Sequence, residues 1–228
     1  MSIKNNISRF KQEIESGNCK LIAVSKTHTV ERVLEAYHAG QRMFGENKVQ
    51  ELVAKWELLP KDIEWHLIGH LQTNKVKYIA AFVSLIHAVD SIKLLEEINK
   101  QAKKVNRKIN CLLQVHIGKE ETKFGFSEQE LMDLIDRGIL STLDSISIQG
   151  LMGMATLTSD EKMIRNEFKQ LKYLFDKMKA RAIPPMEVRE LSMGMSSDYK
   201  IAIEEGSTMV RIGTALFGDR DYSSDLML

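Results

Sequence analysis

The chain has 228 residues, of which 43% are hydrophobic and 28% are charged, and this composition is typical of a globular protein that buries a full core. Its 32 lysines and arginines nearly balance its 31 aspartates and glutamates, so the overall charge gives no electrostatic footprint for nucleic acid or an anionic membrane. The polar N-terminus, residues 1–16, lacks the apolar segment of a signal peptide and predicts a surface helix. No stretch approaches the length of a membrane span. We therefore expect one domain over residues 1–228, in the cytoplasm and bound to neither nucleic acid nor membrane.

Two cysteines, Cys19 and Cys111, lie far apart in the sequence and have no metal-ligand pattern near them. So few cysteines in a chain of this size favour a reducing compartment. We expect both thiols to be buried at strand starts rather than reactive.

Short apolar runs alternate with longer stretches of helical spacing along the whole chain. One helical stretch, 29–40, places Val30, Val33 and Leu34 on one face and ends at Gly40. Strands that alternate with helices predict parallel pairing, and eight such units in slightly fewer than the ~250 residues of a typical (β/α)8 barrel favour that barrel. A doubly wound open sheet is the alternative that the strand count leaves open. The eight predicted strands cover residues 20–25, 42–46, 65–69, 83–89, 110–117, 147–153, 188–194 and 209–218.

The first predicted strand runs directly into a lysine, in "LIAVSKTH" (21–28). A lone lysine at a strand end more often reaches into water. In a barrel, however, chemistry takes place at the C-terminal ends of the strands, where Lys26 would lie. The barrel therefore makes Lys26 a candidate site residue.

The ends of the last two predicted strands combine glycine with small hydroxyl residues. "LSMGMSSD" (191–198) contains Ser196 and Ser197, and "RIGTALFG" (211–218) contains Gly213 and Thr214. Phosphate sites in barrels are often built from these two loops. More commonly, however, a serine such as Ser196 or Ser197 caps the following helix, and a glycine such as Gly213 allows a tight turn.

A lysine and a phosphate cradle on one barrel indicate a ligand with both an aldehyde and a phosphate. A lysine amine condenses with a carbonyl to form a Schiff base, and nearby cations lower its pKa. Pyridoxal 5'-phosphate (PLP) is the cofactor that best unites these features.

Six motifs cover almost the whole chain: "AVSKT" (23–27), "FGENKVQEL" (44–52), "WHLIGHLQTNK" (65–75), "GLMGMA" (150–155), "LSMGMSSD" (191–198) and "EEGSTMVRIGTALFG" (204–218). Together they closely resemble the motifs of the pyridoxal phosphate homeostasis proteins (the YggS/PROSC type). This resemblance implies a fold-type III PLP barrel like the N-terminal domain of alanine racemase, and a role in vitamin B6 homeostasis.

The resemblance also assigns roles to individual residues. It implies that Lys26 forms the Schiff base and that Arg211 points toward the pyridine nitrogen or the phosphate. An arginine near that nitrogen disfavours its protonation, which makes the ring a weaker electron sink. The residues that match the phosphate-binding positions are Ser192, Ser196, Gly213 and Thr214.

Four further residues have two interpretations each. Asn47 is our choice for a polar contact near the ring hydroxyl, and it also fits the N-cap of the next helix. Met154 can pack against the ring or simply form a pocket wall. His66 and His70 suggest a metal, but no carboxylate or cysteine pattern accompanies them. We expect His66 inside the barrel and His70, with Gln72, at its rim.

Amino-acid chemistry on PLP needs an acid or base on the face opposite the lysine. We find no tyrosine placed for it, because the chain has two at the rim or in the tail, Tyr199 and Tyr222, and three in predicted helices, Tyr37, Tyr78 and Tyr173. Only about ten residues follow the eighth predicted strand, which we take to leave no room for the β-domain of alanine racemase.

We therefore predict a PLP-binding protein without catalytic activity that delivers PLP through transient contacts with apo PLP-dependent enzymes. A closed barrel has no exposed strand edge, so we expect a monomer. The alternatives are a small PLP-dependent racemase-like enzyme and a Schiff-base aldolase.

Overall fold

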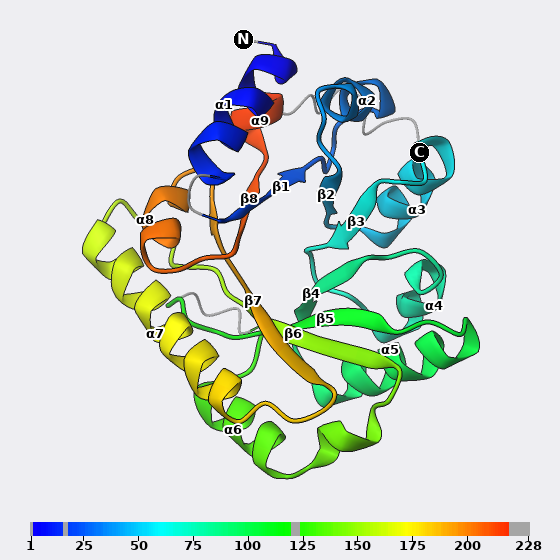
Figure 1. Cartoon of the computed structure of the whole chain (residues 1–228), viewed down its shortest axis with the longest axis vertical. Coiled ribbons are helices and arrows are strands. Elements are labelled where there is room, and N and C mark those ends of the chain that lie inside the picture. Colours follow the sequence, from blue (N-terminus) through cyan, green and yellow to red (C-terminus); the bar gives the residue numbers. More distant parts are fainter. Residues whose placement is uncertain (1, 16–17, 120–123, 219–228) are drawn as a thin grey trace.

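The computed structural model describes residues 2–15, 18–119 and 124–218, and its eight parallel strands close into a barrel in the order β1 to β8 (Figure 1). Each strand pairs with the next in the sequence, and β8 pairs with β1. The strands are β1 (Lys20–Val24), β2 (Met43–Glu46), β3 (Glu64–Leu67), β4 (Leu85–Val89), β5 (Ile109–Gln114), β6 (Ile146–Met152), β7 (Met186–Met195) and β8 (Met209–Ile212).

Helices follow the strands and form the outer layer of the molecule (Figure 1). Short 3-10 helices cover Thr73–Lys75 and Ile139–Thr142. The α-helices are α1 (Ile3–Glu15), α2 (Val30–His38), α3 (Val49–Leu58), α4 (Val76–Ile79), α5 (Ile92–Lys104), α6 (Glu128–Asp136), α7 (Glu161–Ala180), α8 (Tyr199–Glu204) and α9 (Thr214–Phe217).

The predicted barrel and all eight predicted strands are confirmed, but two of the strands end three or more residues earlier than expected. β8 ends at Ile212 instead of residue 218, because Leu216 and Phe217 donate their amides to the carbonyl of Gly213 and so begin α9. β5 ends at Gln114 instead of residue 117, and Val115 forms only an isolated bridge with Phe126. The chain thus leaves the barrel earlier than the apolar pattern indicates.

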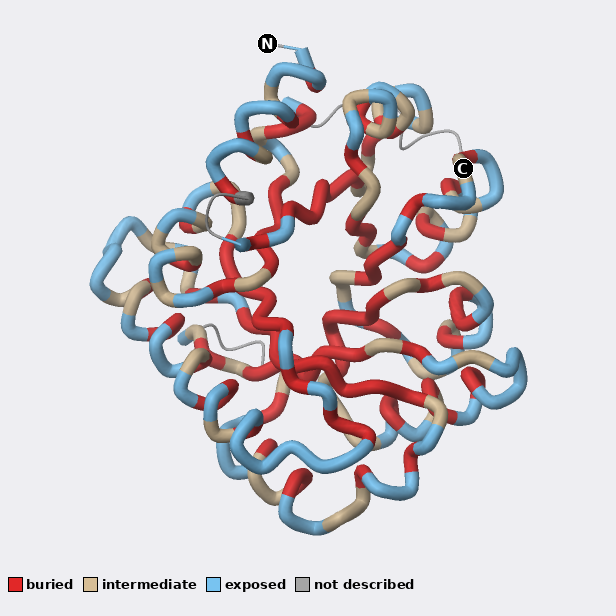
Figure 2. The backbone as a smooth tube through the Cα atoms, in the orientation of Figure 1, coloured by how far each residue is buried: buried red, intermediate tan, exposed pale blue. Residues whose placement is uncertain are grey.

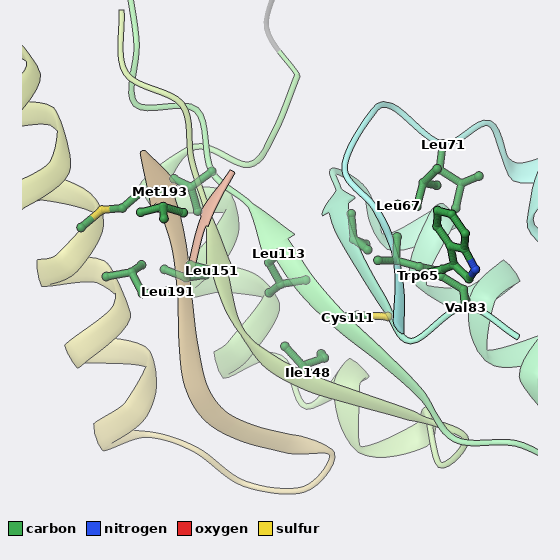
Figure 3. Close-up of a cluster of buried hydrophobic side chains, with 14 of the residues drawn as sticks. Trp65, Leu67, Leu71, Val83, Cys111, Leu113, Ile148, Leu151, Leu191 and Met193 are labelled. Carbon is green, nitrogen blue, oxygen red and sulfur yellow. The ribbon is translucent and has the colours of Figure 1, made fainter. Parts of the chain in front are cut away.

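Two apolar layers hold the barrel together, and the burial map shows most of the strand backbone buried and many helix residues exposed (Figure 2). The larger cluster packs outward-facing strand residues such as Trp65, Leu113 and Leu191 against the helices (Figure 3). Successive strand residues face opposite sides of a sheet, so the strand residues that alternate with these outward-facing ones point into the barrel. There they form a second, smaller apolar cluster, which contains Ile22, Leu85, Ala88, Leu112, Met152 and Met209.

The predicted amphipathic helix is α2, in which Val33 is fully buried while Val30 and Leu34 pack against the core. Ala39 ends this helix, and Gly40 follows with a left-handed φ of 90°. The N-terminal helix is also confirmed as α1.

Both cysteines are buried, as expected. Burial raises the pKa of the Cys19 thiol to about 11 and raises that of Cys111 as well, so both thiols stay protonated and unreactive near neutral pH. Within residues 2–15, 18–119 and 124–218, every helix is too short or too polar to cross a bilayer.

Candidate functional site

A cavity of about 430 Å³ opens at the C-terminal end of the barrel strands. Residues at or just after the ends of seven of the eight strands line it, which is where this fold places its sites. The structure brings together here seven of the eight residues predicted from the sequence: Lys26, Asn47, Met154, Ser196, Arg211, Gly213 and Thr214.

Lys26 enters the cavity because of the strand alternation in β1. Val24 and Lys26 line the cavity, whereas Ser25 between them is fully buried behind the wall. The turn after Lys26 is strained, since Thr27 is β-branched and has a φ of 66°. A residue held in this conformation needs surrounding contacts to keep it there.

Arg211 brings a buried positive charge to the cavity from β8. Its Nη1 donates to the carbonyl oxygen of Ser192 at 2.9 Å and to Ser192 Oγ at 2.6 Å, and its Nη2 donates to the carbonyl oxygen of Gly153 at 3.1 Å. Burial lowers the pKa of the guanidinium to about 10, while the Asp198 carboxylate opposes this effect. Arg211 therefore stays charged near neutral pH.

Ser192 is the one predicted site residue that does not line the cavity. Its hydroxyl is fully buried, accepts from Arg211 and lies 2.9 Å from Nδ1 of His87. These partners place Ser192 behind Arg211. Direct phosphate binding by Ser192 thus stays a prediction, and the hydrogen bonds in this structure connect it to the arginine.

Two buried histidines extend this chain of contacts across the barrel. Nε2 of His87 on β4 lies 2.8 Å from Nδ1 of His66 on β3, which places His66 inside the barrel, as expected. Burial lowers the pKa of His66 to about 3 and that of His87 well below its ordinary value. Both imidazoles are therefore neutral, and each donates with one ring nitrogen and accepts with the other.

Two loops form the part of the cavity that the sequence indicates for a phosphate. Ser196 and Ser197 lie between β7 and α8, and Gly213 and Thr214 lie where α9 begins. The first amides of a helix have no acceptor within the helix and can bind an anion.

The capping interpretation of the two serines is wrong. The N-cap of α8 is Asp198, whose carboxylate turns back to accept from the amide of Met195 at 2.5 Å. Ser196 and Ser197 precede the cap and remain available to the cavity that they line.

Asn47 lines the cavity immediately after β2. The N-cap of α3 is Lys48, in extended backbone conformation, so the capping interpretation of Asn47 is also wrong. Gly69 packs against it closely, because a Cβ added at Gly69 would lie 2.6 Å from the carbonyl oxygen of Asn47. A glycine at position 69 thus allows Asn47 its place in the wall.

The rim of the cavity carries His70, as expected, and its neighbours. Nδ1 of His70 lies 2.9 Å from Oδ2 of Asp90, and its ring lies 4.8 Å from that of Phe124. Met154 is 45% exposed at the same opening. The described part of the chain contains no group of three or more histidine, cysteine, aspartate or glutamate side chains arranged to hold a metal ion.

The sequence interpretation missed several wall residues, among them His28, Gln114 and Met195. His28 stacks on Phe217 with the ring centroids 4.8 Å apart. His28 lies beyond the turn at Thr27, so the strand alternation that places Val24 and Lys26 in the cavity gives no signal for it. Tyr222, weighed above as an acid or base, lies outside the described residues.

Comparison with known proteins places this chain in a family. The sequence model of the family "Alanine racemase, N-terminal domain" matches residues 1–221. The pyridoxal phosphate homeostasis protein of Pasteurella multocida is 38% identical, over 98% of this chain and all of the relative. That of Aquifex aeolicus is 43% identical over 90% of this chain and 89% of the relative. The chain belongs to the pyridoxal phosphate homeostasis protein family.

Solved structures agree with this membership of the pyridoxal phosphate homeostasis protein family. PipY of Synechococcus elongatus, solved without PLP, superimposes with a TM-score of 0.89 at 37% identity, over 95% of this chain and all of PipY. PipY with PLP bound gives a TM-score of 0.85. Alanine racemase of Bartonella henselae, at 18% identity, has a TM-score of 0.72 over 96% of this chain and 58% of the racemase, and shares the fold.

Proposed function

We propose that this protein binds PLP in the barrel cavity as a Schiff base on Lys26 and takes part in intracellular PLP homeostasis without catalysing a reaction. One observation carries the proposal. Lys26, Arg211 and Thr214, at the start of α9, line a single cavity of about 430 Å³.

The residues of the cavity fit this cofactor by their chemistry. PLP supplies an aldehyde, which condenses with a primary amine with loss of water, and a phosphate dianion, which needs positive charge and hydrogen-bond donors. Lys26 offers the amine, and Arg211 offers the charge. The homologue PipY has been solved with PLP bound, which supports the same ligand for this chain.

Each wall residue then has a defined task. The hydroxyls of Ser196 and Thr214 and the amides at the start of α9 hold the phosphate. Asn47 donates or accepts beside the ring, and the side chain of Met154 covers one face of it. Arg211, kept rigid by Ser192 and Gly153, orients the ring or the phosphate.

The titratable groups at the cavity support binding rather than catalysis. Among the described lining residues, they are Lys26, His28, His70 and Arg211. His28 is stacked on Phe217 and His70 lies beside Asp90, and the charge of Arg211 disfavours a second positive charge on a nearby ring nitrogen. We also propose that the protein is a monomeric cytoplasmic carrier that passes PLP to apo-enzymes by transient contact.

The deciding experiment is the visible absorbance spectrum of the protein with PLP, before and after borohydride reduction. Reduction makes the Schiff base permanent, and peptide mass mapping then locates it. We expect the adduct on Lys26, loss of it in Lys26→Ala, and its retention in the matched control Lys200→Ala, which changes an exposed lysine. An adduct elsewhere refutes the assignment. An adduct with a phosphorylated sugar in place of PLP favours the aldolase.

A second experiment separates the carrier from a racemase-like enzyme. Protein loaded with PLP is incubated with a panel of amino acids in deuterated water, and α-proton exchange is followed by NMR. We expect exchange no faster than with free PLP. Rapid exchange that disappears in Lys26→Ala would establish an enzyme.

A further inference from the structure

A buried cluster of charges lies behind the wall that carries Lys26. Lys55 of α3 has a side chain only 6% exposed, and its ammonium donates three hydrogen bonds. The acceptors are the carbonyl oxygen of Ser25 at 2.7 Å, Oε1 of Glu46 at 2.8 Å and Oε1 of Glu51 at 2.7 Å. An ammonium has three protons to donate, so these contacts use all of them. We call Ser25, Glu46, Glu51 and Lys55 the clamp.

The clamp connects two strands at the level of the cavity. Ser25 and Glu46 are both fully buried, Ser25 Oγ donates to Glu46 Oε1 at 2.6 Å, and the amide of Ser25 donates to the carbonyl oxygen of Gly45 at 3.0 Å. Strand alternation turns these two side chains toward α3, whereas the residues that follow them, Lys26 and Asn47, line the cavity. The outer face is thus fixed to the helix, and the inner face carries the candidate site.

The clamp also holds the backbone on both sides of Lys26. Lys55 binds the carbonyl of the preceding residue, Ser25, and Oε1 of Glu51 accepts from the amide of the following residue, Thr27, at 2.6 Å. Thr27 has a φ of 66°, which is unfavourable for a β-branched residue. The hydrogen bond to Glu51 offsets this cost and fixes the turn.

Burying the charged side chains of Lys55 and Glu46 costs folding free energy. Burial raises the pKa of the Glu46 carboxyl to about 7, although the Lys55 ammonium opposes the effect, and Oε2 of Glu46 makes no hydrogen bond. Well-packed apolar side chains of similar volume often give equal or greater stability than a buried ion pair. The cluster is therefore better explained by geometry than by stability.

We propose that Lys55 and Glu51 are positioning residues that set the backbone around Lys26, and through it the direction of the Lys26 amine in the cavity. This inference rests on the proposed function for its purpose, but the positioning itself is a property of the chain without ligand. Lys55 acts from behind the wall and is not itself among the residues that line the cavity.

The test uses Lys55→Met and Lys55→Arg in the full chain. Lys20→Met is the matched control, because Lys20 pairs at 2.5 Å with the buried carboxylate of Glu190, at the opposite end of β1 from Lys26. The rate constant of Schiff-base formation with PLP is measured by stopped-flow absorbance across pH. Stability is measured by urea unfolding.

We expect Lys55→Met to slow Schiff-base formation at least tenfold, and Lys55→Arg to recover much of the rate because a guanidinium donates to the same acceptors. Lys20→Met should lose stability with an unchanged rate. A folded Lys55→Met that forms the adduct at the parental rate overturns the proposal. Equal slowing in Lys20→Met also overturns it, since the effect would then come from general destabilisation.

Two additions keep the test decisive. If Lys55→Met does not fold, Glu51→Ala replaces it, because Glu51 is 21% exposed and its loss still removes the acceptor of the Thr27 amide. If the parent forms no Schiff base, the proposed function fails by itself. Competitive acetylation of the ligand-free protein, with Lys26 compared to Lys200 by mass spectrometry, then tests the positioning. An unchanged Lys26 to Lys200 ratio in the clamp variant overturns it.

Discussion

Nη1 of Arg211 donates to Oγ of Ser192 at 2.6 Å, across the pairing of β7 with β8. The same hydroxyl lies 2.9 Å from Nδ1 of His87 on β4, so one buried oxygen connects three strands. Arg211 reaches the cavity from this anchor. Ser192 thus bears on the site through the position of a charged side chain.

The first prediction removes this anchor. Ser192→Ala leaves a buried donor on Arg211 and a ring nitrogen of His87 short of a partner, and an unmade hydrogen bond of this kind costs about 1–3 kcal/mol of unfolding free energy. PLP retention should weaken in the same variant because Arg211 loses one of the three hydrogen bonds that fix its position. Urea unfolding and dialysis of the loaded protein measure the two effects. Retention equal to the parent would separate Ser192 from the site.

The second prediction concerns the phosphate. Thr214 is exposed at the start of α9, so Thr214→Ala should leave the fold unchanged. The loss of a hydroxyl that bonds to a phosphate should weaken PLP binding by roughly 1–3 kcal/mol. Equilibrium titration by absorbance measures it. Thr142→Ala is the control, because exposed Thr142 precedes β6 at the opposite end of the strands. Equal affinities in both variants would exclude Thr214 from the site.

The sequence predicts the barrel and most of its cavity for a physical reason. Parallel strands end at one face, so residues at strand ends, such as Lys26, Ser196 and Thr214, meet even though they are far apart in the chain. The apolar period of the strands is local, and it can be followed residue by residue. Its limit appears at β8, where the apolar run continues through Phe217 but the backbone turns into α9.

The contacts that support the site could not be predicted in this way. Ser192 and His87 are 105 positions apart, and their contact depends on side chains that cross the barrel interior. Lys55 occupies a helix, where a lysine usually reaches water, and only the position of α3 over Ser25 and Glu46 makes it buried. Such contacts follow from tertiary packing and leave no local pattern.

The third prediction is a pH dependence of stability. His66 and His87 are neutral in the fold, with the pKa of His66 lowered to about 3, whereas unfolded histidines bind protons below about pH 6.5. The unfolded state therefore binds more protons below this pH. The stability contributed by these histidines is complete above about pH 6.5 and decreases by roughly 1.4 kcal/mol per pH unit for each as the pH falls.

Glu46 acts in the opposite direction, because its pKa is raised to about 7 and the stability it contributes is lost as pH rises toward that value. The two histidines outweigh it, so the unfolding free energy should rise between about pH 5 and 6.5. His66→Gln should lower the slope of the unfolding free energy against pH by about 1.4 kcal/mol per pH unit, which corresponds to one proton. Urea unfolding at several pH values measures this slope. An unchanged slope would show that His66 is protonated in the fold.

The last prediction tests the close packing of Gly69 against Asn47. In Gly69→Ala, the new Cβ would lie 2.6 Å from the carbonyl oxygen and 2.8 Å from the Cα of Asn47, so the backbone of Asn47 must move out of the cavity wall. Overpacking of this kind costs typically 1–3 kcal/mol, and we expect PLP binding to weaken about tenfold. Gly138→Ala is the control, because Gly138 has a φ of 69° and no atom near its Cβ position. It should lose about 1 kcal/mol of stability and bind PLP as the parent does. If Gly69→Ala also binds PLP as the parent does, Asn47 does not contribute to binding.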